Sequence, residues 1–122
     1  MAPEQATGQT WVNLRVFGPQ GSAEVRALAD TGATFTKVPH QAAEEAGLQT
    51  EYEVPAEMAD GRTIKRSLDL AELQIEGMRR PVLVSVAENG QTAMVGYTTL
   101  ETVGFKVNPV THRLELAPAI EY

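Results

Sequence analysis

The chain has 122 residues, a length typical of one domain that buries a core without disulfide bonds. It contains no cysteine and only two histidines, which excludes disulfides and thiolate metal sites and argues against a multi-histidine metal centre. The net charge of −6 disfavours a nucleic-acid partner, and every apolar run is far shorter than the roughly 18 residues that a membrane helix needs.

Residues 1–9 show no hydrophobic periodicity, no basic cluster and no apolar core. We therefore expect a flexible N-terminal segment over 1–9 and a single domain over 10–122. The same residues lack the features of a signal peptide. Together with the absence of cysteine, this favours a cytoplasmic location without a membrane partner.

The first half of the chain begins with two alternating runs. Residues 10–17 place Val12, Leu14 and Val16 on one face, and 22–29 alternate again after a Gly-Pro turn, which predicts a hairpin. A short strand is expected over 35–38. A helix follows over 39–46, with Pro39 at its first position and Gly47 as its C-terminal cap.

The next predicted hairpin consists of an extended segment over 51–59, a turn at 60–61 and a long strand over 62–75. Pro55 in the first strand indicates a sheet edge, and Asp-Gly at 60–61 favours a tight turn. In the long strand, Ile64, Leu68 and Leu70 form the expected apolar side. The alternation becomes irregular near Ala71, which suggests a bend or bulge.

The last part of the chain contains the most apolar strand, over 81–87, which we expect to be central. A short apolar run over 93–96, a helix over 97–103 and a final hairpin over 105–116 follow it. Short strands that recur every 8–12 residues predict a mainly β fold. We expect a closed or folded β-barrel with one or two short helices.

The segment 29–34, Ala-Asp-Thr-Gly-Ala-Thr, places an acid directly after a predicted strand. Glycine after the acid allows a tight turn whose N–H groups point at the carboxylate. Two such carboxylates close together share one proton, so that one activates water while the other protonates a carbonyl. Asp, Thr and Gly are also ordinary turn residues, and a plain β-domain in which Asp30 only caps a turn stays an alternative.

The surrounding pieces resemble the retropepsin-like (retroviral-type) aspartic proteases, and most closely the small single-domain bacterial and archaeal members. The resemblance covers about residues 10–118. It rests on the hairpin that leads into Asp30, the turn at 60–61, the apolar-apolar-Gly segment at 94–96 and the helix that follows it.

This resemblance implies a role for each matching residue. Asp30 corresponds to the catalytic aspartate, and Thr31 to the threonine that bonds across the dimer. The remaining assigned residues have supporting roles: Gly32, Ala33 and Thr34 in the active-site loop, Met58, Ala59, Asp60, Gly61 and Arg62 in a flap, and Met94, Val95 and Gly96 behind the loop.

The chain carries one Asp-Thr-Gly, so the resemblance implies a homodimeric aspartic endopeptidase that acts on peptides and needs neither metal nor another cofactor. The alternative is a non-catalytic or weakly active module for dimerisation or peptide binding. Ala33 replaces the hydroxyl residue of two-lobed members, so we expect an activity optimum less acid than theirs. We expect Asp69 to be exposed, and Trp11 and Tyr52 to lie in the core or an interface.

Overall fold

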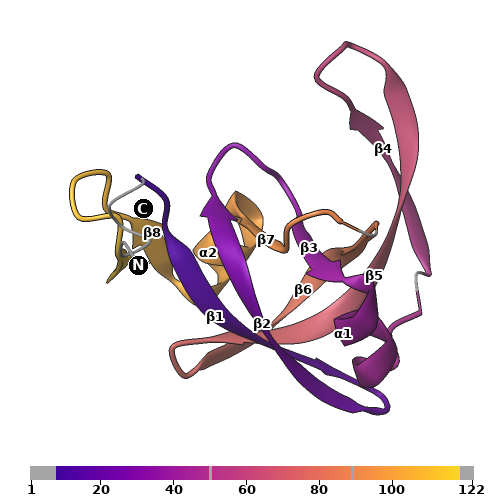
Figure 1. Cartoon of the computed structure of the whole chain (residues 1–122), viewed down its shortest axis with the longest axis horizontal. Helices are drawn as coiled ribbons and strands as arrows, with labels where there is room; N and C mark the ends of the chain where they lie inside the picture. Colours follow the sequence, from indigo (N-terminus) through magenta and orange to yellow (C-terminus); the bar gives the residue numbers. More distant parts are fainter. Residues whose placement is uncertain (1–7, 50, 89, 119–122) are drawn as a thin grey trace.

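The computed structural model describes residues 8–49, 51–88 and 90–118, so the flexibility expected for the start of the chain falls largely outside these ranges. Within them the chain is mainly β with two short helices (Figure 1). The strands are β1 (Trp11–Gly18), β2 (Gly21–Asp30), β3 (Thr36–Pro39), β4 (Tyr52–Glu57), β5 (Thr63–Ile75), β6 (Met78–Ala87), β7 (Met94–Gly96), β8 (Phe105–Val107) and β9 (Leu114–Leu116), and the helices are α1 (His40–Ala46) and α2 (Tyr97–Val103).

The main sheet closes on itself, which confirms the predicted barrel. Its strand order in the described part of the chain is β1-β2-β7-β3-β6-β5-β4, and β1 also pairs with β5. This last pairing, from Leu14 with Ile75 to Phe17 with Glu72, joins the two ends of a six-stranded barrel. Strand β4 stays outside the barrel and pairs only with β5, as Pro55 in its sequence predicted.

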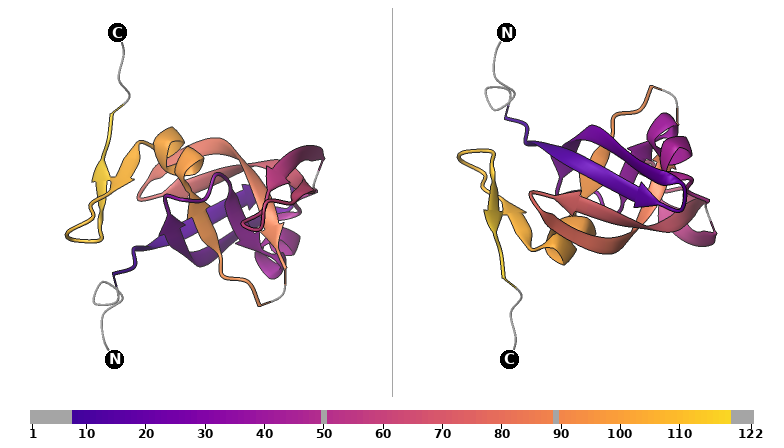
Figure 2. Two further views of the ribbon diagram at one scale, coloured as in Figure 1. Left: turned by 90° about the horizontal axis from the view of Figure 1, so that it is seen from above. Right: turned by 90° about the horizontal axis from the view of Figure 1, so that it is seen from below.

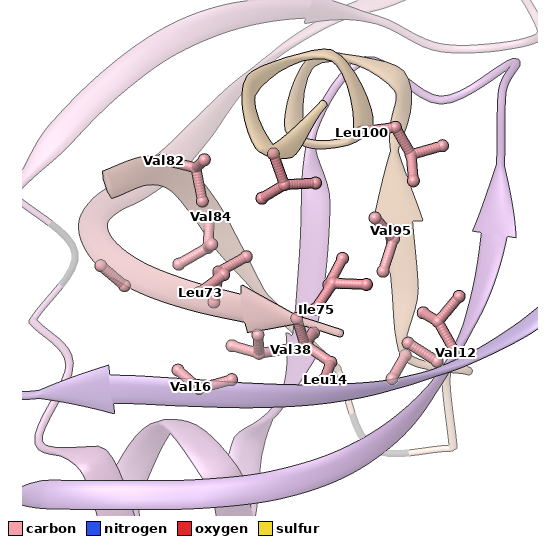
Figure 3. Close-up of a cluster of buried hydrophobic side chains, with 14 of the residues drawn as sticks. Val12, Leu14, Val16, Val38, Leu73, Ile75, Val82, Val84, Val95 and Leu100 are labelled. Carbon is pink, nitrogen blue, oxygen red and sulfur yellow. The ribbon is translucent and has the colours of Figure 1, made fainter. Parts of the chain in front are cut away.

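The barrel interior is filled by the apolar faces of its alternating strands (Figure 3). Val12, Leu14 and Val16 of β1 all point inward, as their spacing predicted, and each is at most 5% exposed. They meet Val84 from the central strand β6 and Val95 from β7. Burying one such side chain contributes about 1.5–3 kcal/mol, so this closed interior is the main source of stability.

Both helices end at glycines in the left-handed conformation, Gly47 with φ 77° and Gly104 with φ 83°. Both C-terminal caps are therefore confirmed. The start of α1 differs by one residue from the prediction. Pro39 ends β3 with an extended backbone and is the N-cap, not the first helical residue.

Strand β5 departs from the predicted alternation at an earlier point than Ala71. Leu68 and Asp69 are consecutive and both buried, so the residues that face the barrel interior change from even to odd numbers at this point. As a result Leu70 is 53% exposed, although it was expected to be buried. The Asp69 carboxylate accepts hydrogen bonds from the Gln49 N–H at 2.7 Å and the Leu70 N–H at 2.8 Å. The expectation that Asp69 is exposed was therefore wrong, because its carboxylate is paired with one backbone donor from a loop 20 residues away and with one from the next residue.

Two hairpins project from the barrel. The β4–β5 hairpin extends beyond it, and the β8–β9 hairpin forms a separate two-stranded sheet to one side (Figures 1 and 2). Tyr52 of β4 is 49% exposed, so it does not lie in the core of this chain. None of the helices in the described residues is long and apolar enough to span a membrane.

Candidate active site

Asp30 is the last residue of β2, at the point where the chain leaves the barrel. It pairs with Gly96 of the parallel strand β7 and is partly exposed. The Gly32 N–H donates a hydrogen bond to Asp30 Oδ1 at 2.9 Å, and the Ala33 N–H donates to the Asp30 carbonyl at 3.1 Å. Both contacts hold the loop 31–35 in a tight turn. The carboxylate is thus positioned by backbone donors while it stays accessible.

Helix α2 holds this loop from behind. At its start, the Tyr97 N–H donates to the Ala33 carbonyl at 2.8 Å. One residue later, the Thr98 hydroxyl donates to the Thr34 carbonyl at 2.6 Å. Two consecutive carbonyls of the loop are therefore fixed by two consecutive residues of the helix.

Gly96 lies where the loop and β7 approach most closely. A Cβ atom at this position would meet the Thr34 carbonyl oxygen and the Phe35 carbonyl group at 2.7 Å, distances that real Cβ atoms do not show. Its N–H donates to Thr36 Oγ1 at 3.1 Å. Gly96 is extended, with φ −80°, so the requirement for glycine here is one of space and not of backbone conformation.

Buried threonines connect β3 to α2 beneath the loop. Thr36 and Thr99 are both 0% exposed, and the Thr36 hydroxyl donates to Thr99 Oγ1 at 2.7 Å while it accepts from Gly96. Buried polar groups in such a network are fully satisfied and rigidify their surroundings. The sequence analysis did not identify these two residues, although a hydroxyl inside an otherwise apolar strand is a usable signal.

The structure divides the segment 94–96 between two roles. Val95 and Gly96 are buried behind the loop. Met94 is partly exposed and pairs with Leu28 of β2 and with Lys37 of β3. Because residues paired across adjacent strands share one face of a sheet, these three side chains lie on one face. Asp30, two residues after Leu28, shares that face.

Thr31 is exposed beside Asp30, and both residues line a cleft of about 470 Å³. The cleft lies between the end of β2 and the C-terminal hairpin, and His112 with φ 56° lies at its wall.

The predicted flap residues form the tip of the β4–β5 hairpin. The Met58 N–H donates to the Arg62 carbonyl at 2.7 Å, and Gly61 has φ 88°, so the turn is one residue longer than a two-residue loop. Arg62 pairs with Asp60 at 2.6 Å. No hydrogen bond or ion pair within the described ranges joins this tip to the loop of Asp30, and the two lie apart in Figure 1.

Metal ligands do not cluster around Asp30. Among the residues that the structure describes, no group of three or more histidine or acidic side chains is placed to hold a metal ion. The hydrogen bonds around Asp30 give the site a positioned carboxylate on a braced loop. The Gly32 N–H donor orients this carboxylate through one of its two oxygens.

Comparison with protein families supports this reading of the site. A protein-family model described as "Aspartyl protease" matches residues 12–111. The matched range contains the loop of Asp30, the β4–β5 hairpin and the segment 94–96. A search of curated proteins finds no match.

Proposed function

The chain belongs to the aspartyl protease family, of the retropepsin-like type, and from this premise we propose that it is a homodimeric aspartic endopeptidase. The observation that carries the proposal is the position of Asp30: a partly exposed carboxylate at a strand end, oriented by the Gly32 N–H and braced by α2. The described chain contains a single Asp-Thr-Gly turn, so a pair of such carboxylates needs two chains.

In the proposed dimer, Asp30 of each chain lies next to the two-fold axis. Two carboxylates within about 3 Å do not both ionise, so they hold one proton between them. The ionised member accepts a proton from a water molecule, whose oxygen attacks the peptide carbonyl carbon. The protonated member donates to the carbonyl oxygen. Collapse of the resulting diol, with proton transfer to the leaving nitrogen, breaks the C–N bond without a covalent enzyme intermediate.

The substrate in this proposal is an extended peptide, because an extended chain pairs its backbone with a neighbouring hairpin while its side chains alternate between pockets. The β4–β5 hairpin is suited to cover it. It projects beyond the barrel and ends in the tip at 58–62. Its first strand, β4, pairs only with β5, the strand that continues into the barrel. In the proposed complex this tip moves over the loop of Asp30 and excludes water from the carboxylate pair.

The test is cleavage of a mixed peptide library by the wild-type chain and by Asp30→Asn. The amide keeps the shape of the side chain but cannot accept a proton from water, so cleavage should fall below detection. Sedimentation of both proteins checks that the variant keeps its dimer. Full activity of pure Asp30→Asn, or a strict monomer of the wild-type chain at high concentration, would refute the proposal, whereas peptide binding without cleavage would favour the non-catalytic module.

A further inference from the structure

Lys37 lies on the sheet face that carries Asp30. It pairs with Met94 of β7, which pairs with Leu28 of β2, so these three side chains form one row across adjacent strands. Asp30 is two residues beyond Leu28 on the same face. The barrel interior receives the other face of β3, because Thr36 and Val38, the neighbours of Lys37, are both 0% exposed.

Lys37 has no partner for its charge. Half of the lysines and arginines take part in a hydrogen bond or ion pair, as in the pairs of Arg15 with Glu24 and of Arg79 with Glu72. In the described residues, the cations without a hydrogen bond, ion pair or ring contact are Lys37, Lys65, Arg66, Lys106 and Arg113. Lys37 is the one among these that lies in β3, two strands from the strand of Asp30, whereas the others belong to the two projecting hairpins.

The described residues around Lys37 offer its ammonium group no opposite charge. Its neighbours in the row, Met94 and Leu28, are apolar, and Lys37 itself is only partly exposed. When a bound peptide covers an ammonium group, the loss of its hydration is unfavourable unless an opposite charge compensates for it. A carboxylate that arrives with a bound peptide would supply this compensation. The chain as a whole carries a net charge of −6, so any attraction for an acidic group is local.

We infer that Lys37 forms a subsite for an acidic side chain of the peptide substrate, an inference that rests on the proposed function. Strands β2 and β3 are separated by two strand spacings, or roughly 10 Å. Along β2, Asp30 is two residues beyond Leu28, an offset of roughly 7 Å. Together these distances place Lys37 and Asp30 roughly 12 Å apart along the sheet. An extended peptide advances about 3.3 Å per residue. The acidic residue therefore lies roughly two to four residues from the cleaved bond.

The two-fold symmetry of the dimer makes this inference more specific. Each chain contributes one Lys37, so an acidic residue should be favoured at equivalent distances on both sides of the cleaved bond. The row Leu28–Met94 lies between Lys37 and Asp30, so the residues next to the cleaved bond should be apolar. The expected pattern is an apolar centre flanked on each side by an acidic position.

The experiment compares peptide pairs that differ by Glu or Gln at one position, over four positions on each side of a cleaved bond. For the wild-type chain, kcat/KM should be about fivefold higher with Glu at the two symmetric positions, as expected for a partly exposed ion pair. Lys37→Gln should abolish this ratio, and Lys37→Glu should favour Lys over Gln instead. Arg80→Gln, the same charge change at an exposed position of β6, is the matched control and should leave the ratio unchanged.

Equal kcat/KM for Glu and Gln peptides at every position, or a preference that survives in Lys37→Gln, would overturn the inference. A second measurement separates this failure from failure of the proposed function. Fluorescence anisotropy of the same peptides with Asp30→Asn should show tighter binding of Glu than of Gln peptides, and loss of this difference in the double variant Asp30→Asn, Lys37→Gln. If the wild-type chain cleaves peptides but Glu and Gln peptides bind equally, only the Lys37 subsite is refuted. If Glu peptides bind more tightly but the wild-type chain cleaves none of them, only the proposed protease function is refuted. If no peptide binds, both proposals are overturned.

Discussion

A single methyl group at Gly96 tests whether the loop of Asp30 is held in place from behind. In Gly96→Ala the new Cβ would lie 2.7 Å from the Thr34 carbonyl oxygen and from the carbonyl carbon and oxygen of Phe35. All three are backbone atoms, so no flexible side chain can move aside. The φ of −80° is ordinary for alanine, which removes backbone strain as a competing explanation.

The size of the effect follows from these distances. Ordinary contacts begin at 3.4 Å, so the loop must move away from β7 by roughly 0.7 Å. Overpacking of this kind costs about 1–3 kcal/mol, which lowers the urea midpoint by roughly 1 M for a domain of this size. The same movement displaces Asp30, which pairs with Gly96, and misplacement by about 1 Å can cost on the order of 100-fold in rate.

Two measurements on Gly96→Ala check this reasoning: urea unfolding at one fixed protein concentration, since dimerisation contributes to stability, and kcat/KM on a cleaved peptide. The matched control is Gly77→Ala in the β5–β6 turn. A Cβ there meets nothing within 4 Å, but φ is 82°, so alanine costs about 1 kcal/mol in conformational strain and should leave kcat/KM unchanged. Wild-type stability together with wild-type kcat/KM in Gly96→Ala would refute the claim that Gly96 positions the loop.

Two further predictions concern the same loop. Thr36→Val removes the hydroxyl that donates to Thr99 and accepts from the Gly96 N–H. Because both partners would then be buried and unpaired, the free energy of unfolding measured in urea should fall by about 2 kcal/mol. An unchanged urea midpoint would contradict the role of this hydrogen-bond network. Ala33→Ser should restore a hydroxyl donor beside the carboxylate pair and extend activity to lower pH, measured as the acid limb of kcat/KM against pH. A wild-type optimum already at about pH 2, typical of two-lobed enzymes, would contradict this second prediction.

Local chemistry in the sequence was enough to predict most elements of the fold. Alternation identified β1 and β2, and glycines at 47 and 104 marked the ends of both helices, because only glycine adopts the left-handed cap without strain. The Asp-Thr-Gly turn was also visible in the sequence. Its geometry depends on contacts within three residues, such as the Gly32 N–H with Asp30 Oδ1.

The errors in β5 show where local patterns fail. Leu70 was assigned to the apolar side and is exposed, whereas Asp69 was expected outside and is buried. Burial of Asp69 depends on the Gln49 N–H, which lies 20 residues away in the chain. An acid can be buried wherever the fold supplies donors, and alternation in one strand contains no information about donors from another segment.

Neighbours a few residues apart are enough to specify the mainly β class, the turns, the helix ends and the acid on its tight turn, so these features are predictable from the sequence. The closure of the barrel through β1 and β5, and the parallel pairing of β7 with β2, depend on contacts between distant segments and are visible only in the folded chain. These pairings join segments about 60 residues apart, and they place Gly96 against the loop and Lys37 on the face of Asp30. The single Asp-Thr-Gly was readable in the sequence, but its bracing by α2 exists only in the folded chain.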